Sequence, residues 1–372
     1  MLIEGAKWCG KTTSAKHIAK SVIEMDRPDM TEQYQQMARI NPSNLLEGKV
    51  PHLIDEWQIA TNIWNAVRYE VDQRGEFGQF ILTGSSVPAA LDESMHTGTG
   101  RIVRMQMRPM SLFESKDSTG QVSLMDLFNK KDISTVDNHS IDEIAFLICR
   151  GGWPAALNHG KKVALKQAFD YYDAVVNDDI SRVDRVKRDS ERTKRILKSY
   201  ARNVATQASL ETIRSDVISN DVETFDKEAL YGYLNALKRI FVIEDSPAWN
   251  PNLRSKTAIR TSDTRYFVDP SIAVAALGLG PTDLVNNLEL MGLIFENLCV
   301  RDLRIYADAL DGSVYHYRDK TGLECDAVIH LRNGSYGLVE VKLGGDQSIN
   351  EGAESLLKLT SKIDTEKMKK PA

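Results

Sequence analysis

The stretch Gly5-Ala-Lys-Trp-Cys-Gly-Lys-Thr-Thr13 decides the fold of the amino-terminal part of the chain. It fits the pattern G-x-x-x-x-G-K-[ST] and lies between an apolar strand, which begins at Leu2 and Ile3, and a predicted amphipathic helix over residues 13–23. The two glycines allow a tight loop whose backbone N–H groups point inward at the amino terminus of that helix. The pattern therefore predicts a phosphate-binding loop. The alternative is a chance match in a glycine-containing turn.

The positions of this loop have separate predicted roles. The predicted nucleotide-binding residues are Gly5, Ala6, Lys7, Trp8, Cys9, Gly10, Lys11, Thr12 and Thr13. Lys11 is expected to reach the β and γ phosphates, and the Thr12 hydroxyl is expected to ligate Mg²⁺. The bound species is therefore predicted to be a nucleoside triphosphate.

Two further strands end in polar side chains. His52-Leu-Ile-Asp-Glu-Trp57 ends in adjacent carboxylates, of which Asp55 is expected to hold Mg²⁺ through water and Glu56 to polarise an attacking water. Such an acidic pair is often only a surface turn, but behind a phosphate loop it favours phosphoryl transfer to water. The strand over residues 79–86 ends in hydroxyls, and Thr83 or Ser85 is expected to orient that water beside the γ-phosphate.

These three strands, in this order, resemble the AAA+ branch of the P-loop ATPases. The resemblance extends to four more motifs: His96-Thr-Gly-Thr-Gly-Arg-Ile102, Arg108-Pro-Met-Ser-Leu-Phe-Glu114, Gly151-Gly-Trp-Pro154 and Asp178-Asp-Ile-Ser-Arg182. Together they resemble the prokaryotic ATP-binding family that couples an AAA+ domain to a carboxyl-terminal domain of unknown function. The resemblance covers nearly the whole chain and implies that the nucleotide is ATP. It also implies a carboxyl-terminal module similar to the PD-(D/E)XK nuclease fold.

The length of 372 residues exceeds what one hydrophobic core usually holds, so several domains are expected. We predict an α/β protein with a P-loop, AAA+-like ATPase domain over residues 1–140. A helical bridge with a winged-helix-like element follows over 141–250, and a nuclease-like α/β domain over 251–372. Because relatives in the resembling family carry more chain before Gly5 and after residue 359, both ends are expected to be truncated.

Charge, cysteines and hydropathy limit the class of protein. The formal net charge of −5 argues against a nucleic-acid-binding surface over the whole chain but allows a local basic face. Cys9, Cys149, Cys299 and Cys325 have neither metal-ligand nor paired spacing, which favours reduced thiols and a cytoplasmic location. No apolar stretch approaches the roughly twenty residues of a membrane helix, and no signal peptide precedes the loop. A membrane partner is therefore not expected.

The middle of the chain is predicted to be mostly helical. Helices are expected over 141–149, 161–179 and 191–206, and these are expected to form a lid or bridge over the nucleotide site. Residues 210–249 resemble a winged helix, with an amphipathic helix over 227–239 and a wing strand over 241–245. Such a module binds DNA in some proteins, but acidic residues between 221 and 228 oppose that role, and protein packing is the alternative.

Two basic features have both a functional and a structural interpretation. Residues 182–202 carry more basic than acidic side chains, which predicts either a nucleic-acid-binding face or a solvated helix face. Arg101 is a candidate sensor arginine, or an arginine that acts on a neighbouring copy in a homo-oligomer, because a planar cation stabilises charge at the γ-phosphate. The alternative is a surface arginine that follows the turn at Gly100.

A second candidate site lies near the carboxyl terminus. Asp326 lies in a predicted strand over 324–330, and Glu340 and Lys342 share one face of the next predicted strand, 336–342. Carboxylates beside an ammonium can hold Mg²⁺ and activate water for attack on a phosphodiester. With Glu296, which matches the upstream acid of the resembling family, these residues form the D-x(n)-E-x-K arrangement. The alternative is a weak ion pair on an exposed strand.

Taken together, these patterns predict an ATPase that uses Mg²⁺ and is coupled to DNA or to a protein partner. The first alternative is a nucleotide-gated DNA-binding or scaffolding module that holds ATP without turnover. The second is an ATP-controlled, Mg²⁺-dependent DNA nuclease.

Overall fold

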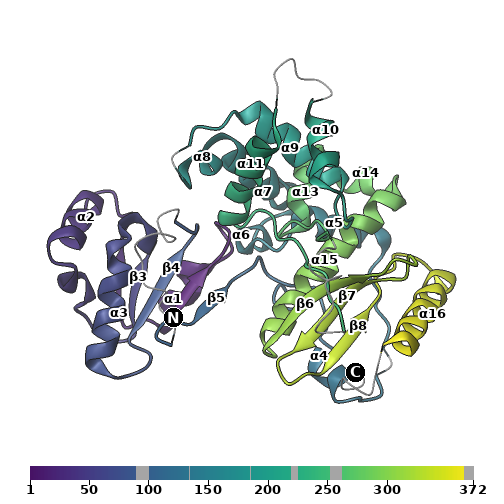
Figure 1. Ribbon diagram of the computed structural model, residues 1–372, viewed down its shortest axis with the longest axis horizontal. Helices are drawn as coiled ribbons and strands as arrows, with labels where there is room; N and C mark the ends of the chain where they lie inside the picture. Colours follow the sequence, from purple (N-terminus) through teal and green to yellow (C-terminus); the bar gives the residue numbers. More distant parts are fainter. Residues whose placement is uncertain (89–99, 134, 185, 219–224, 252–261, 364–372) are drawn as a thin grey trace. The chain divides into compact units, whose positions relative to one another are not determined.

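The structure is a computed structural model, and it describes residues 1–88, 100–133, 135–184, 186–218, 225–251 and 262–363 (Figure 1). Residues 96–99 of the motif at 96–102, Arg185 of the basic run, and the acidic residues 221 and 223 lie outside these ranges. No helix among the described residues is both long enough and apolar enough to cross a membrane. The four cysteines are free, as expected.

The chain divides into two compact units. The first contains Met1–Pro109, Asn177–Arg188 and Tyr233–Val242, and the second contains Met110–Val176, Asp189–Gly232 and Ile243–Ala372. Residues 110–140, which we placed in the first predicted domain, belong to the second unit. The predicted division into three domains stays a prediction.

The first unit contains a five-stranded parallel sheet of order β2-β3-β4-β1-β5. Its strands are β1 (Leu2–Glu4), β2 (Ser21–Glu24), β3 (His52–Asp55), β4 (Phe80–Gly84) and β5 (Arg104–Gln106). The accompanying helices are α1 (Lys11–Ile18), α2 (Thr31–Ile40) and α3 (Asn62–Arg74), with 3-10 turns η1 (Pro42–Leu46) and η2 (Trp57–Ala60). Each strand we predicted here is present, and all their carboxyl ends lie at one edge of the sheet.

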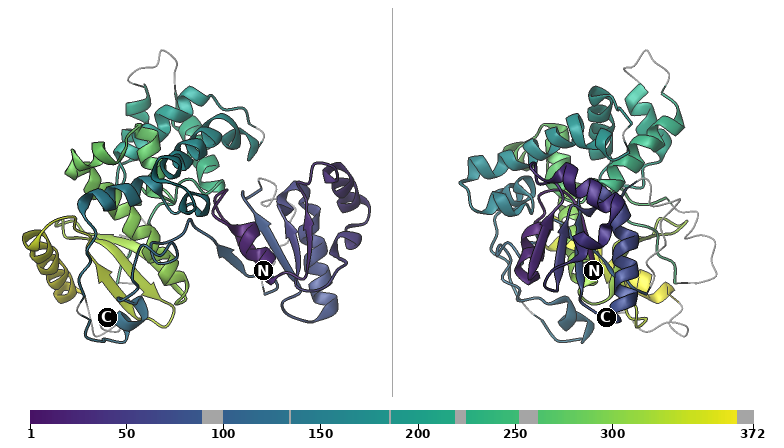
Figure 2. Two further views of the ribbon diagram at one scale, coloured as in Figure 1. Left: turned by 180° about the vertical axis from the view of Figure 1, so that it is seen from behind. Right: turned by 90° about the vertical axis from the view of Figure 1, so that its left-hand side faces the viewer.

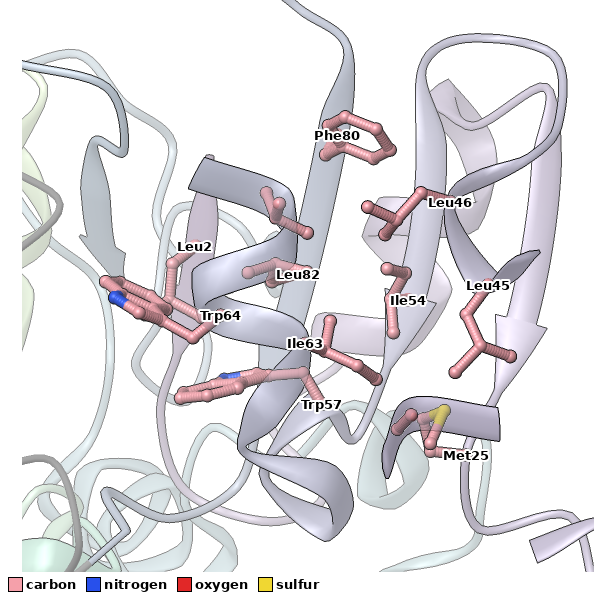
Figure 3. Packing of buried hydrophobic residues seen from close by; sticks show 12 residues of the cluster. Leu2, Met25, Leu45, Leu46, Ile54, Trp57, Ile63, Trp64, Phe80 and Leu82 are labelled. Carbon is pink, nitrogen blue, oxygen red and sulfur yellow. The ribbon is translucent and has the colours of Figure 1, made fainter. Parts of the chain in front are cut away.

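The central strands of this sheet are buried on both faces. Leu2, Ile54 and Leu82 belong to one core cluster, in which the indoles of Trp57 and Trp64 lie 5.2 Å apart (Figure 3). The residues next to them along the strands, Ile3, Leu53 and Ile81, form a second cluster. Because side chains alternate along a strand, the continuous apolar runs of the sequence are explained by helices or turns on both sides of the sheet.

The helix predicted over residues 13–23 is wrong in its carboxyl half. Helix α1 ends at Ile18, Ala19 is extended, and Ser21–Glu24 form strand β2. Val22 pairs with Leu53 in the parallel ladder to β3, and Ile18 is 63% exposed instead of facing a core. Pairing with a strand thirty residues later therefore overrides the local helical pattern.

The second unit combines helices with a small antiparallel sheet of order β6-β7-β8. Its strands are β6 (Gly312–Arg318), β7 (Glu324–Leu331) and β8 (Tyr336–Val339). Its helices include α4 (Leu124–Phe128), α5 (Ile141–Arg150), α6 (Pro154–Leu157), α7 (Lys161–Ala174), α9 (Ser190–Arg202), α10 (Leu210–Ile218), α13 (Pro270–Leu277), α14 (Pro281–Val285), α15 (Leu288–Asp308) and α16 (Asp346–Lys362). Both α15 and α16 pack on the sheet (Figure 2).

The π-helical turn after α7 and helix α11 each contain residues of both units, and a strand predicted after α11 is absent from the described residues. After α7 the chain forms a π-helical turn, Val175–Asp179, and the short helix α8 (Ile180–Arg182), while α11 (Lys227–Arg239) begins in the second unit and ends in the first. The wing strand predicted over 241–245 is wrong. Phe241 has a left-handed φ of 56°, and only isolated bridges join Ile243 to Phe267 and Ser246 to Thr264.

The two motifs at 108–114 and 151–154 meet in a buried joint within the second unit. The Met110 N–H donates to the Gly152 carbonyl at 2.7 Å, and the Gly152 N–H donates to the Asp269 carboxylate at 2.9 Å. The Arg301 guanidinium, 1% exposed, bonds both Asp269 and Asp302. Because the buried charges are paired, the joint is a structural device that connects three distant parts of the chain.

Candidate active site

The phosphate loop follows β1 directly and has the conformation that its glycines predict. Gly5 has a φ of 156°, and a Cβ there would lie 2.0 Å from the Met107 carbonyl oxygen, so only glycine fits. Trp8 and Gly10 have left-handed φ values of 64° and 101°. Successive residues of this kind turn backbone N–H groups toward one concave side, which is how such loops bind anions.

The Lys11 side chain lies inside this loop. It is 4% exposed, and its Nζ donates to the carbonyls of Gly5 at 2.9 Å and Ala6 at 2.7 Å. Its Nζ also lies 3.9 Å from the Cys9 sulfur, and a buried ammonium whose partners here are neutral groups is a strong potential partner for a phosphate oxygen. Cys9 is buried as well, and its thiol donates to the Met107 carbonyl at 3.4 Å.

Three predicted site residues meet at the Asp55 carboxylate, which is 5% exposed at the end of β3. The Thr12 hydroxyl, in the first turn of α1, donates to Asp55 Oδ1 at 2.8 Å. The Thr83 hydroxyl from β4 donates to the same oxygen. The structure therefore brings Thr12, Asp55 and Thr83 into one cluster of oxygen atoms beside the phosphate loop.

Glu56 lies next to this cluster in a left-handed conformation with a φ of 53°. Its Oε2 accepts a hydrogen bond from the Ser85 hydroxyl at 2.8 Å and another from the Gln58 amide. The two hydroxyls that the sequence offered for orienting the water therefore have different partners. Thr83 donates to Asp55, and Ser85 donates to Glu56. Gln58 was missed, and the only available signal was its place two residues after Glu56.

The structure does not bring Arg101 to this site. Arg101 Nε pairs with Asp72 Oδ1 at 2.6 Å near the carboxyl end of α3. Arg101 also lines a small cavity with Met1, where β1 begins. It therefore lies at the amino-terminal edge of the parallel sheet, opposite the phosphate loop. The sequence could not predict this position, because the order of residues along the chain does not specify at which edge of the sheet Arg101 lies. Action on a neighbouring copy stays a prediction.

A residue far along the chain contacts the phosphate loop instead. Lys7 Nζ pairs with Asp179 Oδ1 at 2.5 Å, and Asp179 is 8% exposed in the π-helical turn of the first unit. The motif that contains Asp179 is visible in the sequence. Its contact with Lys7, 172 positions away, could not be predicted from spacing.

The second predicted site is assembled in part. Lys342 Nζ lies 2.7 Å from Glu340 Oε1 and 3.8 Å from Asp326 Oδ2, and the Val341 N–H donates to Asp326 at 2.7 Å. Strand β8 ends at Val339, so Glu340 and Lys342 follow the strand rather than belong to it, but both approach Gly352 of α16. Their predicted common face is therefore present.

Glu296 lies near these charges, on α15. The Tyr266 hydroxyl donates to its Oε1 at 2.5 Å. Burial, and then the nearby charge of Asp326, raises the pKa of Glu296 to about 8. Burial, and then Glu340, raises the pKa of Asp326 to about 6. Burial is the main cause of both raised pKa values, and buried acidic groups with raised pKa values often occur in catalytic sites.

The fit of this second site to a metal ion is incomplete. Glu340 Oε2 is buried without a hydrogen-bond partner among the described residues, as a metal ligand could be. However, no group of three or more His, Cys, Asp or Glu within the described part of the chain is arranged to hold a metal ion. The Lys342 ammonium instead lies between two carboxylates, so the residues as placed do not form a metal centre.

The basic run over residues 182–202 is largely engaged within the protein. Arg188 forms a two-pronged ion pair with Asp184, and Arg192 lies over the Phe225 ring at 5.2 Å. Lys194 pairs with Glu191, three positions before it. These contacts reduce the charge that could be presented to nucleic acid, and they favour the structural interpretation of this run.

Three parts of the chain match models of protein families. Residues 1–116 match the family described as AAA domain. The amino-terminal part of the chain is therefore similar to an AAA domain, which agrees with its phosphate loop and parallel sheet. Residues 141–283 match Domain of unknown function (DUF8612), and residues 291–370 match Domain of unknown function (DUF4143). The carboxyl-terminal domain of unknown function that the resemblance implied is present, and its likeness to a nuclease is not tested by this match.

Comparison with solved structures found two distant similarities. The Walker-type ATPase paby2304 of Pyrococcus abyssi is 15% identical with a TM-score of 0.42, over 74% of this chain and 90% of that one. The Aeropyrum pernix ORC1 protein in complex with DNA is 13% identical with a TM-score of 0.22, over 77% and 87% of the two chains. At these values neither structure bears on the function of this chain. No curated protein matches the sequence.

Proposed function

We propose that the AAA domain binds ATP with Mg²⁺ and hydrolyses it. The observation that carries the proposal is the convergence of Lys11, Thr12, Asp55, Thr83 and Glu56 at the carboxyl ends of β1, β3 and β4. Open α/β sheets bind ligands at this edge. A buried cation, an oxygen cluster and a separate carboxylate are the groups that phosphoryl transfer to water requires.

The oxygen cluster suits the metal that such a nucleotide carries. Thr12 and Asp55 would hold Mg²⁺, because hydroxyl and carboxylate oxygens are its preferred protein ligands and these two already touch at 2.8 Å. When bound, the ion neutralises negative charge on the phosphates. Thr83 keeps the Asp55 carboxylate oriented toward Thr12 by donating to the same oxygen that Thr12 contacts.

The remaining residues act on the phosphates and on water. Lys11 exchanges its two carbonyl partners for phosphate oxygens, which is favourable because charge-assisted hydrogen bonds are stronger than those to neutral carbonyls. Glu56 accepts a proton from the attacking water, and Ser85 holds its carboxylate in place from β4. The backbone N–H groups of the loop stabilise charge that develops on the transferred group.

Phosphate release from ATP tests the proposal, with wild type compared with Glu56→Gln and with the exposed control Glu47→Gln. We expect turnover in wild type and in the control but not in Glu56→Gln, with ATP binding intact in all three. DNA added to the same assay tests coupling to a nucleic-acid partner. ATP binding without turnover in wild type would reject hydrolysis and favour the nucleotide-gated DNA-binding or scaffolding module.

A second candidate function, phosphodiester hydrolysis, is favoured by the cluster of Glu296, Asp326, Glu340 and Lys342. Its support is the shared environment of the three carboxyls and the ammonium beside them. Nicking of supercoiled plasmid with Mg²⁺ or Mn²⁺ tests it, with Lys342→Ala as the inactive variant and Lys358→Ala of α16 as the control. Equal nicking by both variants, or none by wild type, would leave the cluster with a structural role.

A further inference from the structure

The first unit contains a cavity of about 430 Å³ beside the catalytic carboxylate, and its lining includes no residue of the phosphate loop. Its wall is formed by residues of α2, of η2 and the start of α3, of the segment that follows β4, and of positions 182–184. The polar members of this wall include Arg39, Gln58, Asn62, Ser86 and Arg182. A volume of this size falls in the range of small-ligand sites, and one nucleotide fits within it.

The charge balance of the wall is positive. Arg39 is exposed and forms no ion pair within the described part of the chain. Arg182 forms a 3.4 Å pair with Asp178, in which both side chains are more than half exposed, and such pairs contribute little. Among the lining residues that the structure describes, the acidic one is Asp184, and the guanidinium of Arg188 already neutralises it at 2.7 Å.

The amino terminus of α3 adds to this positive potential. Thr61 and Asn62, its cap and first residue, both line the cavity. The Thr61 side chain makes no cap hydrogen bond, so it does not satisfy the first N–H groups of this helix of thirteen residues. The positive end of a helix dipole near two guanidinium groups favours an anion.

We propose that this cavity binds a phosphate-bearing ligand of nucleotide size, separate from the ATP at the phosphate loop. Arg39 and Arg182 contact its phosphate oxygens, and the amide and hydroxyl side chains of Gln58, Asn62 and Ser86 complete the polar contacts. The phosphate group belongs either to a free small anion or to the backbone of a nucleic-acid strand. Both sources share the chemistry that the wall recognises.

Gln58 connects the cavity with Glu56. Its Nε2 donates to Glu56 and lies 3.3 Å from the Ser85 hydroxyl, while its Oε1 is buried without a partner among the described residues. A phosphate in the cavity competes with Glu56 for the N–H groups of the Gln58 amide. Glu56 then loses the hydrogen bond from Gln58 and keeps the one from Ser85. This part rests on the proposed function, because it links occupancy of the cavity to ATP turnover.

Direct binding tests the cavity without any need for turnover. A short fluorescent single-stranded oligonucleotide is titrated with the full chain, with inorganic pyrophosphate as a competitor, and Lys11→Ala is included to exclude binding at the phosphate loop. We expect Arg39→Ala/Arg182→Ala to weaken binding at least about tenfold. The control Lys20→Ala/Arg27→Ala removes the same charge from exposed positions in the same unit and is expected to bind like wild type.

The outcomes distinguish a free small anion from a nucleic-acid strand, and they test binding in the cavity separately from ATP hydrolysis. Competition by pyrophosphate at similar affinity identifies a small anion, whereas oligonucleotide binding that pyrophosphate does not displace identifies a strand. Equal binding by the two double variants, or no binding of either probe, would overturn the proposal. If wild type turns over ATP, the bound probe is expected to change its rate, and Gln58→Leu is expected to remove that change. If wild type does not turn over ATP, only the proposal of hydrolysis is refuted. The binding measurement still tests whether the cavity binds a phosphate-bearing ligand.

Discussion

The Thr12 hydroxyl donates a 2.8 Å hydrogen bond to the Asp55 carboxylate, although the two residues are 43 positions apart. The contact joins the first turn of α1 to the end of β3, and Thr83 fixes the same carboxylate from β4. Hydrogen bonds within the protein therefore orient the polar groups of the site. Preorganisation of this kind lowers the cost of ordering side chains at the moment of binding.

Replacing Lys11 with Ala is expected to abolish tight nucleotide binding. The variant loses the buried ammonium that lies inside the loop, and ATP affinity is predicted to fall by roughly 100-fold. Calorimetric titration with ATP measures the effect, and Lys20→Ala, an exposed lysine just beyond α1, is the control. Unchanged affinity in Lys11→Ala would remove the phosphate-loop assignment.

Replacing Ser85 with Ala is expected to slow hydrolysis without weakening ATP binding. Glu56 loses one of its two hydrogen-bond donors, so its carboxylate is less well placed for the water, and kcat is predicted to fall about tenfold with KM nearly unchanged. Steady-state kinetics separate the two constants. Ser43→Ala, exposed in η1, should behave as wild type. A rise in KM alone would assign Ser85 to substrate binding instead.

The raised pKa of Glu296 predicts a pH-dependent stability of the second unit. Its pKa is about 8 in the folded protein and near 4.5 when unfolded, so the folded state holds the extra proton between these values. The free energy of unfolding is therefore expected to fall as pH rises through this window, by on the order of a few kcal/mol in total. Asp326, whose pKa is also raised, contributes in the same direction.

Urea denaturation at about pH 5 and about pH 8.5 measures this slope. Glu296→Gln is expected to flatten it, because an amide does not titrate, whereas Glu289→Gln, exposed in the first turn of the same helix, should keep it. The same slope in wild type and Glu296→Gln would show that Glu296 is ionised in the folded protein.

Two glycine substitutions are expected to change stability in opposite directions. A Cβ on Gly152 would lie 2.1 Å from the Met110 carbonyl oxygen, so Gly152→Ala must displace the buried joint and is expected to cost about 1–3 kcal/mol or more. Gly292, in α15, has open space around its Cβ position, and Gly292→Ala should stabilise the helix by up to about 1 kcal/mol. Thermal unfolding of both variants measures the difference. A neutral Gly152→Ala would argue against a rigid joint.

The features that follow from local sequence were predicted well. The strands at Leu2, His52 and Phe80 have apolar runs that end in polar residues, and their parallel arrangement brings Asp55 and Thr83 together at one edge. Helices α5, α7 and α9 follow from apolar periodicity. Helices α5 and α9 also have side-chain caps, such as the capping box of Ser140 with Glu143.

The features that depend on distant contacts were not predicted. Ser21–Glu24 has no strong strand signal, and it becomes β2 only because β3 offers an edge. Nothing local places Arg101 at the far edge of the sheet or joins Asp179 to Lys7. The sequence contained the residues of these contacts, but which of them meet is decided by the tertiary fold.

The first unit is assembled from three separate stretches of chain, the last of which ends at Val242. During translation, its sheet emerges from the ribosome long before the stretch that supplies Asp179 and Arg182. The Lys7–Asp179 contact at the phosphate loop therefore cannot form until about half of the polypeptide has been synthesised. For the same reason, a gene fragment cut after the sheet would encode a phosphate loop without the Asp179 partner of Lys7.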